Sequence, residues 1–176
     1  MAPTASVTDR IEKQVRLEAP VARVWEAVAN AEQFGRWFGV KLDGPFVEGQ
    51  GVRGVWEGGL PVDAIRGIEA QLGLEPSPVK MPDSNAVFCT VERIDRPRLF
   101  SFRWIPYGID ATIDPAHEPT TLVEFRLDAQ GSATLLTIVE SGFDRVPAHR
   151  RRRAFLMNDG GWTAQAENLR KHVQGS

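Results

Sequence analysis

The sequence has one cysteine, almost no excess of charge and no long apolar run. Cys89 alone cannot form an internal disulfide, which fits a reducing compartment. The formal net charge of −2 creates no field that would attract nucleic acid or an anionic membrane. No stretch approaches the roughly 20 apolar residues that span a bilayer. The first residues lack a secretory signal pattern, so we expect a cytoplasmic protein with a short disordered tail at residues 1–8.

Several kinds of chemical site are also missing from the sequence. The three histidines, His117, His149 and His172, are far apart and lack metal-ligand spacing. No Gly-x-Ser-x-Gly motif or glycine-rich phosphate loop occurs, and Cys89 has no evident base near it in sequence. We therefore expect neither a metal nor a cofactor.

Alternation of apolar and polar residues predicts strands through most of the chain. With 176 residues, 42% of them hydrophobic, the chain can form one sizeable domain, expected at 9–174. Two short helices are predicted at 20–30 and 31–37. A tight turn is expected at 128–131, between the last two strands. The expected strands are 11–17, 39–42, 51–56, 87–94, 99–104, 121–127 and 132–141.

Residues 144–173 are predicted to form a long C-terminal helix with an apolar stripe. Gly160-Gly161 interrupts the pattern, which favours a join between two helices with Asp159 capping the second. Consecutive strands followed by one striped helix indicate an α+β fold, in which a curved antiparallel sheet wraps around the helix. Such a fold tends to enclose a cavity. The stripe consists of Phe155, Trp162, Ala166, Leu169 and Val173.

Four short segments resemble a known family. Glu18–Val28 is similar to the strand-to-helix entry of the START-like (SRPBCC) superfamily, and within it to the group named after the activator of the heat-shock-protein ATPase homologue. Arg36–Phe38, Arg98–Trp104 and Gly160–Trp162 agree in order and spacing. The resemblance implies a helix-grip fold. Its members include lipid carriers, polyketide cyclases and co-chaperones, so it does not determine a function.

The segment at residues 57–86 is longer than the link that members of that family usually have at this place. Pro61 and the helical spacing of Val62, Ile65 and Leu72 predict a small extra helix that stops at Gly73, followed by a proline-rich loop. We call residues 57–86 the insert, and regard it as a possible lid over the cavity.

Aromatic residues as a group are the main candidates for binding a ligand, although for any single one ordinary core packing is the favoured interpretation. Glu140 is a weak candidate for a general acid or base, since its strand face should point inward. It could instead pair with Arg103 or Arg126. The arginines at 150–153 spread around a helix and favour a solvated, salt-bridged surface. The candidate ligand-binding residues are Trp37, Phe38, Trp56, Phe102, Trp104, Phe155 and Trp162.

The leading hypothesis is a protein that binds a small apolar or aromatic molecule between the C-terminal helix and the sheet. An enzyme of the cyclase or dehydratase type is a second hypothesis and a chaperone-associated regulator a third. The sequence favours a non-enzymatic role, since it shows no catalytic constellation. Homodimerisation through a sheet face or edge is compatible with a domain of this size.

Overall fold

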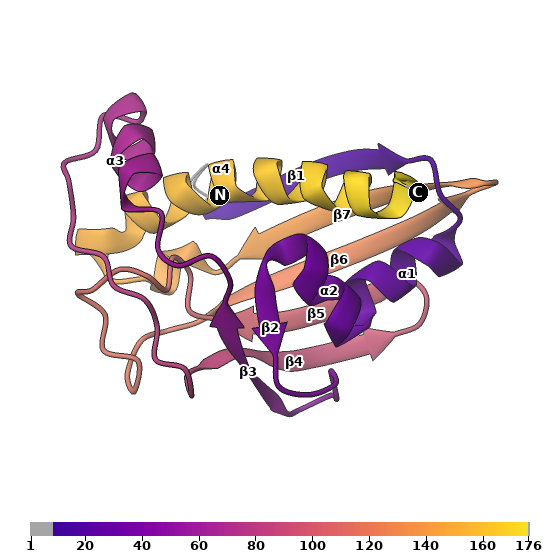
Figure 1. The fold of residues 1–176 in the computed structure, drawn as a ribbon, viewed down its shortest axis with the longest axis horizontal. Helices are drawn as coiled ribbons and strands as arrows, with labels where there is room; N and C mark the ends of the chain where they lie inside the picture. The colour runs from indigo at the N-terminus through magenta and orange to yellow at the C-terminus, as the bar shows by residue number, and fades with distance from the viewer. Residues whose placement is uncertain (1–8, 176) are drawn as a thin grey trace, which may run out of the picture.

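The computed structural model describes residues 9–175, and the tail expected at 1–8 lies outside them. Seven antiparallel strands form one sheet in the order β1-β7-β6-β5-β4-β3-β2. The sheet is curved and unclosed, with β1 and β2 at its two edges (Figure 1). The strands are β1 Arg10–Leu17, β2 Val40–Leu42, β3 Gly51–Trp56, β4 Val87–Asp95, β5 Leu99–Trp104, β6 Thr121–Gln130 and β7 Ala133–Ser141.

Four α-helices accompany the sheet. The C-terminal helix α4 runs along the sheet, and α1 and α2 lie beside it, as Figure 1 shows. The predicted α+β helix-grip fold is confirmed. The helices are α1 Val21–Ala29, α2 Ala31–Phe38, α3 Val62–Gln71 and α4 Ala148–Gln174, with a short 3-10 helix at Phe143–Arg145 before α4.

The entry from α2 into β2 depends on glycine. The Asn30 side chain accepts a hydrogen bond from the backbone N–H of Gln33, which begins α2, and Gly39 ends it with φ at 89°. A Cβ on Gly35 would lie 2.3 Å from the backbone oxygen of Val40. Only glycine therefore allows α2 to pack this closely on β2, and the packing places Phe34 and Phe38 against the sheet core.

The last hairpin is tighter than the sequence indicated. The expected turn at 128–131 is wrong, because β6 continues to Gln130, which pairs with Ala133. Gly131 and Ser132 alone make the connection, and Gly131 has φ at 65°. A two-residue loop with positive φ matches the twist of antiparallel strands, so pairing extends through the polar end of β6.

The predicted join inside the C-terminal helix is also wrong. The helix α4 is continuous through Gly160-Gly161, and Asp159 is not a cap. The Asp159 carboxylate instead lies 3.0 Å from Nζ of Lys13, the one charged residue on the otherwise apolar face of β1. Burial of Trp162, Ala166 and other residues of the apolar stripe along α4 offsets the helix cost of the two glycines.

Because a Cβ at Gly160 or Gly161 meets no atom within 4 Å, alanine at either position should stabilise the protein. We expect Gly160→Ala and Gly161→Ala each to raise the free energy of unfolding by about 1 kcal/mol, the helix-propensity difference. Chemical denaturation measures it. A loss of stability in both variants would contradict a continuous helix at this point.

Candidate functional site

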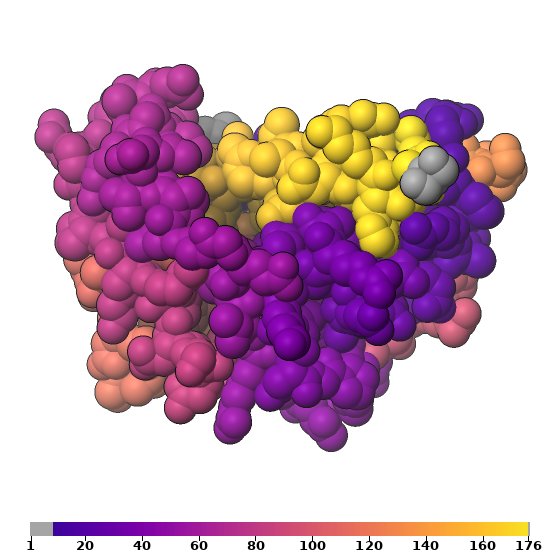
Figure 2. Space-filling view, viewed as in Figure 1, coloured from indigo at the N-terminus to yellow at the C-terminus, as the bar shows by residue number. Residues whose placement is uncertain are grey.

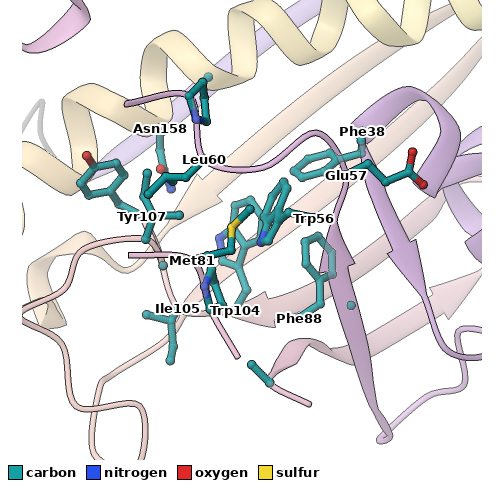
Figure 3. Close-up of a pocket in the computed structure, with 18 of the residues that line it drawn as sticks. Phe38, Trp56, Glu57, Leu60, Met81, Phe88, Trp104, Ile105, Tyr107 and Asn158 are labelled. Carbon is teal, nitrogen blue, oxygen red and sulfur yellow. The ribbon is translucent and has the colours of Figure 1, made fainter. Parts of the chain in front are cut away.

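A pocket of about 680 Å³ lies between α4, the sheet and the insert. Figure 2 shows the surface hollowed where the insert meets α4. One part of the wall is aromatic, and Figure 3 labels Phe38, Trp56, Phe88 and Trp104 among its residues. Another part is aliphatic, with Leu60 and Met81 from the insert and Ile105 and Ile109 from the loop after β5. The aromatic lining residues are Phe38, Trp56, Phe88, Trp104, Tyr107 and Trp162.

The aromatic rings touch one another and so hold one another in place. The ring centroids of Trp104 and Trp162 are 5.5 Å apart at an interplanar angle of 30°. Phe38 contacts both Trp162 and Trp56, at 6.0 and 5.5 Å. Aromatic pairs at these separations gain energy beyond the area they bury. The result is a wall of flat faces that is already formed without a ligand.

Glu140 lies behind this wall, fully buried in the middle of the fold. Its Oε2 accepts hydrogen bonds from Nε1 of Trp104 at 2.7 Å and from Oγ1 of Thr121 at 2.6 Å. Its Oε1 accepts from Nε1 of Trp162 at 2.9 Å. Nδ2 of Asn158 donates to both carboxylate oxygens, at 3.0 and 3.2 Å. The carboxylate thus orients two tryptophans and an asparagine of the pocket wall without being part of that wall.

Two opposing effects act on the Glu140 carboxyl. Burial raises its pKa, and the hydrogen bonds from Thr121, Trp104, Trp162 and Asn158 lower it, with burial the larger effect. Tryptophan and asparagine N–H groups can only donate, so they require acceptor oxygens at this position. No cationic side chain of the described residues forms a salt bridge with Glu140, so hydrogen bonds alone hold it.

Glu140→Gln should lower the free energy of unfolding by about 1–3 kcal/mol, because the new amide nitrogen would face N–H donors and leave one unsatisfied. Since burial raises the folded-state pKa, the wild type loses stability as pH rises through that pKa, and the variant lacks this step. The difference in the free energy of unfolding between the wild type and Glu140→Gln should therefore be largest near pH about 4 and become smaller toward neutral pH.

Urea denaturation of both proteins across this pH range measures the difference. A gap that stays constant, or that widens with pH, would show that the Glu140 pKa is not raised.

The insert is fastened to α4 through Glu69, which is 1% exposed. Its carboxylate lies 2.6 Å from Nη1 of Arg66 and 2.6 Å from Nη1 of Arg153 on α4. It also accepts from the backbone N–H of Ser77 at 3.1 Å, and Arg153 donates to the backbone oxygen of Glu75 at 2.6 Å. One acidic residue thus joins both halves of the insert to α4.

The loop between β5 and β6 is held from α4 in the same way. Arg150, 2% exposed, donates to the backbone oxygen of Pro106 at 2.7 Å and pairs with Glu118 at 2.5 Å and Asp110 at 3.5 Å. The insert pairs with this loop through the backbone of Lys80, whose N–H donates to the oxygen of Ile109. The expectation of a solvated arginine surface is therefore wrong for Arg150 and Arg153, because two loops bring acidic groups to them.

Arg153→Met should loosen the insert without unfolding the sheet, since removing one partner of a buried ion pair leaves the other charge uncompensated. We expect faster amide hydrogen exchange in α3 and around Ser77, with exchange in β5–β7 unchanged. Arg152, exposed on the same helix, provides the matched control Arg152→Met, which should change neither. Equal exchange in the two variants would show that the Glu69 pair does not hold the insert.

Four of the seven residues expected to bind a ligand line the pocket: Phe38, Trp56, Trp104 and Trp162. The other three do not line it. Trp37 is buried and donates to the backbone oxygen of Ala27 at 2.8 Å. Phe102 is fully buried in the core, and Phe155 packs on Phe143 with ring centroids 5.2 Å apart. Glu140, the catalytic candidate, faces inward but lies outside the lining.

Sequence reasoning missed Phe88, Tyr107 and Asn158. Asn158 could have been found, because it precedes Trp162 by four residues and so shares its face of α4. Phe88 lies beside a register shift in the pairing of β3 with β4, which obscures its alternation. Tyr107 is in a loop with φ at 50°, a position that no periodicity reveals.

Residues 9–175 contain neither a membrane-spanning helix nor a cluster of metal-ligating side chains. No helix there is long and apolar enough to cross a membrane. No group of three or more His, Cys, Asp or Glu side chains in this range is arranged to hold a metal ion.

The fold and the pocket together define a helix-grip protein. A family model described as activator of Hsp90 ATPase homolog 1-like protein matches residues 18–174. The chain belongs to this family, and the resemblance noted from the sequence is confirmed. No curated protein matches the chain significantly.

Solved structures share the fold at low identity. MLL2253 from Mesorhizobium loti is 19% identical with a TM-score of 0.62, covering 94% of this chain and 96% of that one. DynU16, a protein of the dynemicin biosynthetic locus, is 21% identical with a TM-score of 0.60 over 95% of this chain. This chain spans about half, 48%, of the DynU16 chain. CalU16 from Micromonospora echinospora is 21% identical with a TM-score of 0.58, covering 94% and 74% of the two chains. These identities show a common fold alone.

Proposed function

We propose that this protein binds a small apolar or aromatic molecule in the pocket between α4, the sheet and the insert. The observation that carries the proposal is the preformed wall of Phe38, Trp56, Phe88, Trp104 and Trp162 around a space of about 680 Å³. Ligand pockets commonly have volumes of about 300–1,000 Å³ and an apolar, aromatic lining with few polar groups.

The same geometry gives no support to an enzyme of the cyclase or dehydratase type. A general acid or base must come within hydrogen-bond reach of the group it serves. The oxygens of Glu140 already accept from four side chains, and Trp104, Trp162 and Asn158 stand between the carboxylate and the pocket. Among the described residues that line the pocket, Glu57 is the only carboxylate, and it is exposed.

The chaperone-associated hypothesis stays a prediction that only the family description supports. A cytoplasmic location and a homodimer also stay predictions.

A substitution can fill the pocket without disturbing the fold. Gly161 lines the pocket, and a Cβ added there meets no atom within 4 Å. We expect Gly161→Leu to fold normally and to weaken binding of an aromatic probe at least ten-fold. Its neighbour Gly160 has the same freedom but does not line the pocket, so Gly160→Leu is the matched control and should bind as the wild type does.

Calorimetric titration with 2-methoxynaphthalene, a neutral bicyclic probe, measures the difference. Equal binding by the wild type and both variants would place the probe elsewhere. The absence of any binding, or of thermal stabilisation by any apolar or aromatic compound in a wider screen, would contradict the proposed function.

A further inference from the structure

The polar groups of the pocket carry information about the ligand beyond its apolar surface. Among the described residues that line the pocket there is no lysine, arginine or histidine. Glu57 is the carboxylate in the lining, and the Glu140 carboxyl lies behind the tryptophans. An anionic ligand would enter a site with no counter-charge and would lose its hydration without compensation. The lining therefore disfavours an anionic ligand.

The indole N–H groups of Trp104 and Trp162 are not available to a ligand, because Glu140 already accepts from both. The side chain of Gln165 is held at both ends, since its Nε2 donates to the backbone oxygen of Phe38 and its Oε1 accepts from Asn168. The Tyr107 hydroxyl is buried with no partner among the described residues, and in Figure 3 it points away from the tryptophans.

Asn158 differs from these groups. Its Nδ2 donates to Glu140, so its Oδ1 must point the other way, and reversing the amide would set an oxygen against the carboxylate. Oδ1 accepts no hydrogen bond from residues 9–175. Among the described residues, the Tyr107 hydroxyl is the only buried side-chain polar atom without a hydrogen-bond partner. Asn158 Oδ1 also has no partner among them, so it is not buried. Since Asn158 lines the pocket, its oxygen is an acceptor open to a ligand.

We propose that Asn158 is the specificity-determining residue of the pocket, with Oδ1 accepting a hydrogen bond from a neutral hydroxyl group on an aromatic ligand. Glu140 is a positioning residue, because its carboxylate fixes which end of the Asn158 amide faces the pocket. This inference rests on the proposed function. It adds that the ligand is an uncharged hydroxylated aromatic molecule rather than a fatty acid or another carboxylate.

Three probes that share the naphthalene ring test the inference by calorimetric titration at pH about 7.5, where the phenol is neutral. The probes are 2-naphthol, which has a donor, 2-methoxynaphthalene, which lacks it, and 2-naphthoate, which is an anion. The wild type should bind 2-naphthol about five-fold more tightly than 2-methoxynaphthalene, the effect of one neutral hydrogen bond. It should bind 2-naphthoate the most weakly.

Asn158→Leu should bring the ratio of 2-naphthol to 2-methoxynaphthalene close to one while still binding both. Thr163→Leu, a change from polar to apolar at an exposed position of α4 outside the pocket, is the matched control and should keep the five-fold ratio. Glu140→Gln should reduce the ratio as well, since its amide no longer dictates the orientation of Asn158. If Asn158→Leu does not fold, Asn158→Ala replaces it, and the wild-type series tests the acceptor without any variant.

The outcomes separate the inference from the proposed function. Equal affinity of the wild type for 2-naphthol and 2-methoxynaphthalene would overturn the role of Asn158 while leaving a binding pocket. Tightest binding of 2-naphthoate would overturn the exclusion of anions. Failure of all three probes to bind would count against the proposed function itself and would remove the basis of the inference.

Discussion

The buried carboxylate of Glu140 is the interaction on which the rest of the site depends. It lies on β7 and accepts from Trp104 on β5, Thr121 on β6, and Asn158 and Trp162 on α4. An anion taken out of water is tolerated only when hydrogen bonds replace its hydration, so the carboxylate and its four donors must form together. The hydrogen bonds to Glu140 therefore fix the position of α4 over the sheet and the orientation of the two indole rings at the pocket.

A second set of buried charges determines the far wall of the pocket. The insert and the loop between β5 and β6 are each tied to α4 by buried ion pairs. Arg150 and Arg153, less than one helical turn apart on α4, hold them through Asp110, Glu118 and Glu69. The pocket therefore lies between an aromatic wall fixed by a carboxylate and an aliphatic wall fixed by arginines. Polar groups provide the geometry on both sides, and apolar groups provide the surface.

Periodicity predicted most of the fold because alternation and helical spacing report which face of an element is buried. Most of the strands, the extra helix in the insert and the stripe on α4 followed from it, whereas the end of β6 did not. It failed at Gly160-Gly161, where tertiary packing of Trp162 and Ala166 outweighed the local cost of two glycines. The same reasoning selected seven aromatic residues for the site but could not separate those that line the pocket from those that fill the core. Trp37 and Trp162 are both buried aromatics on helices, and only the position of each helix over the sheet distinguishes them.

By itself the sequence determined the fold class and the presence of an aromatic interior, since both depend on patterns along the chain. The tertiary structure alone decided the partners of each polar group. Glu140 meets Asn158 and Trp162, Lys13 meets Asp159, and Glu69 meets Arg153 at a separation of 84 residues. A hydrogen bond depends on distances within a few tenths of an ångström between groups far apart in the chain. No pattern of neighbouring residues encodes such a distance. For that reason the hydrogen-bond partners at the pocket could be identified only from the tertiary structure.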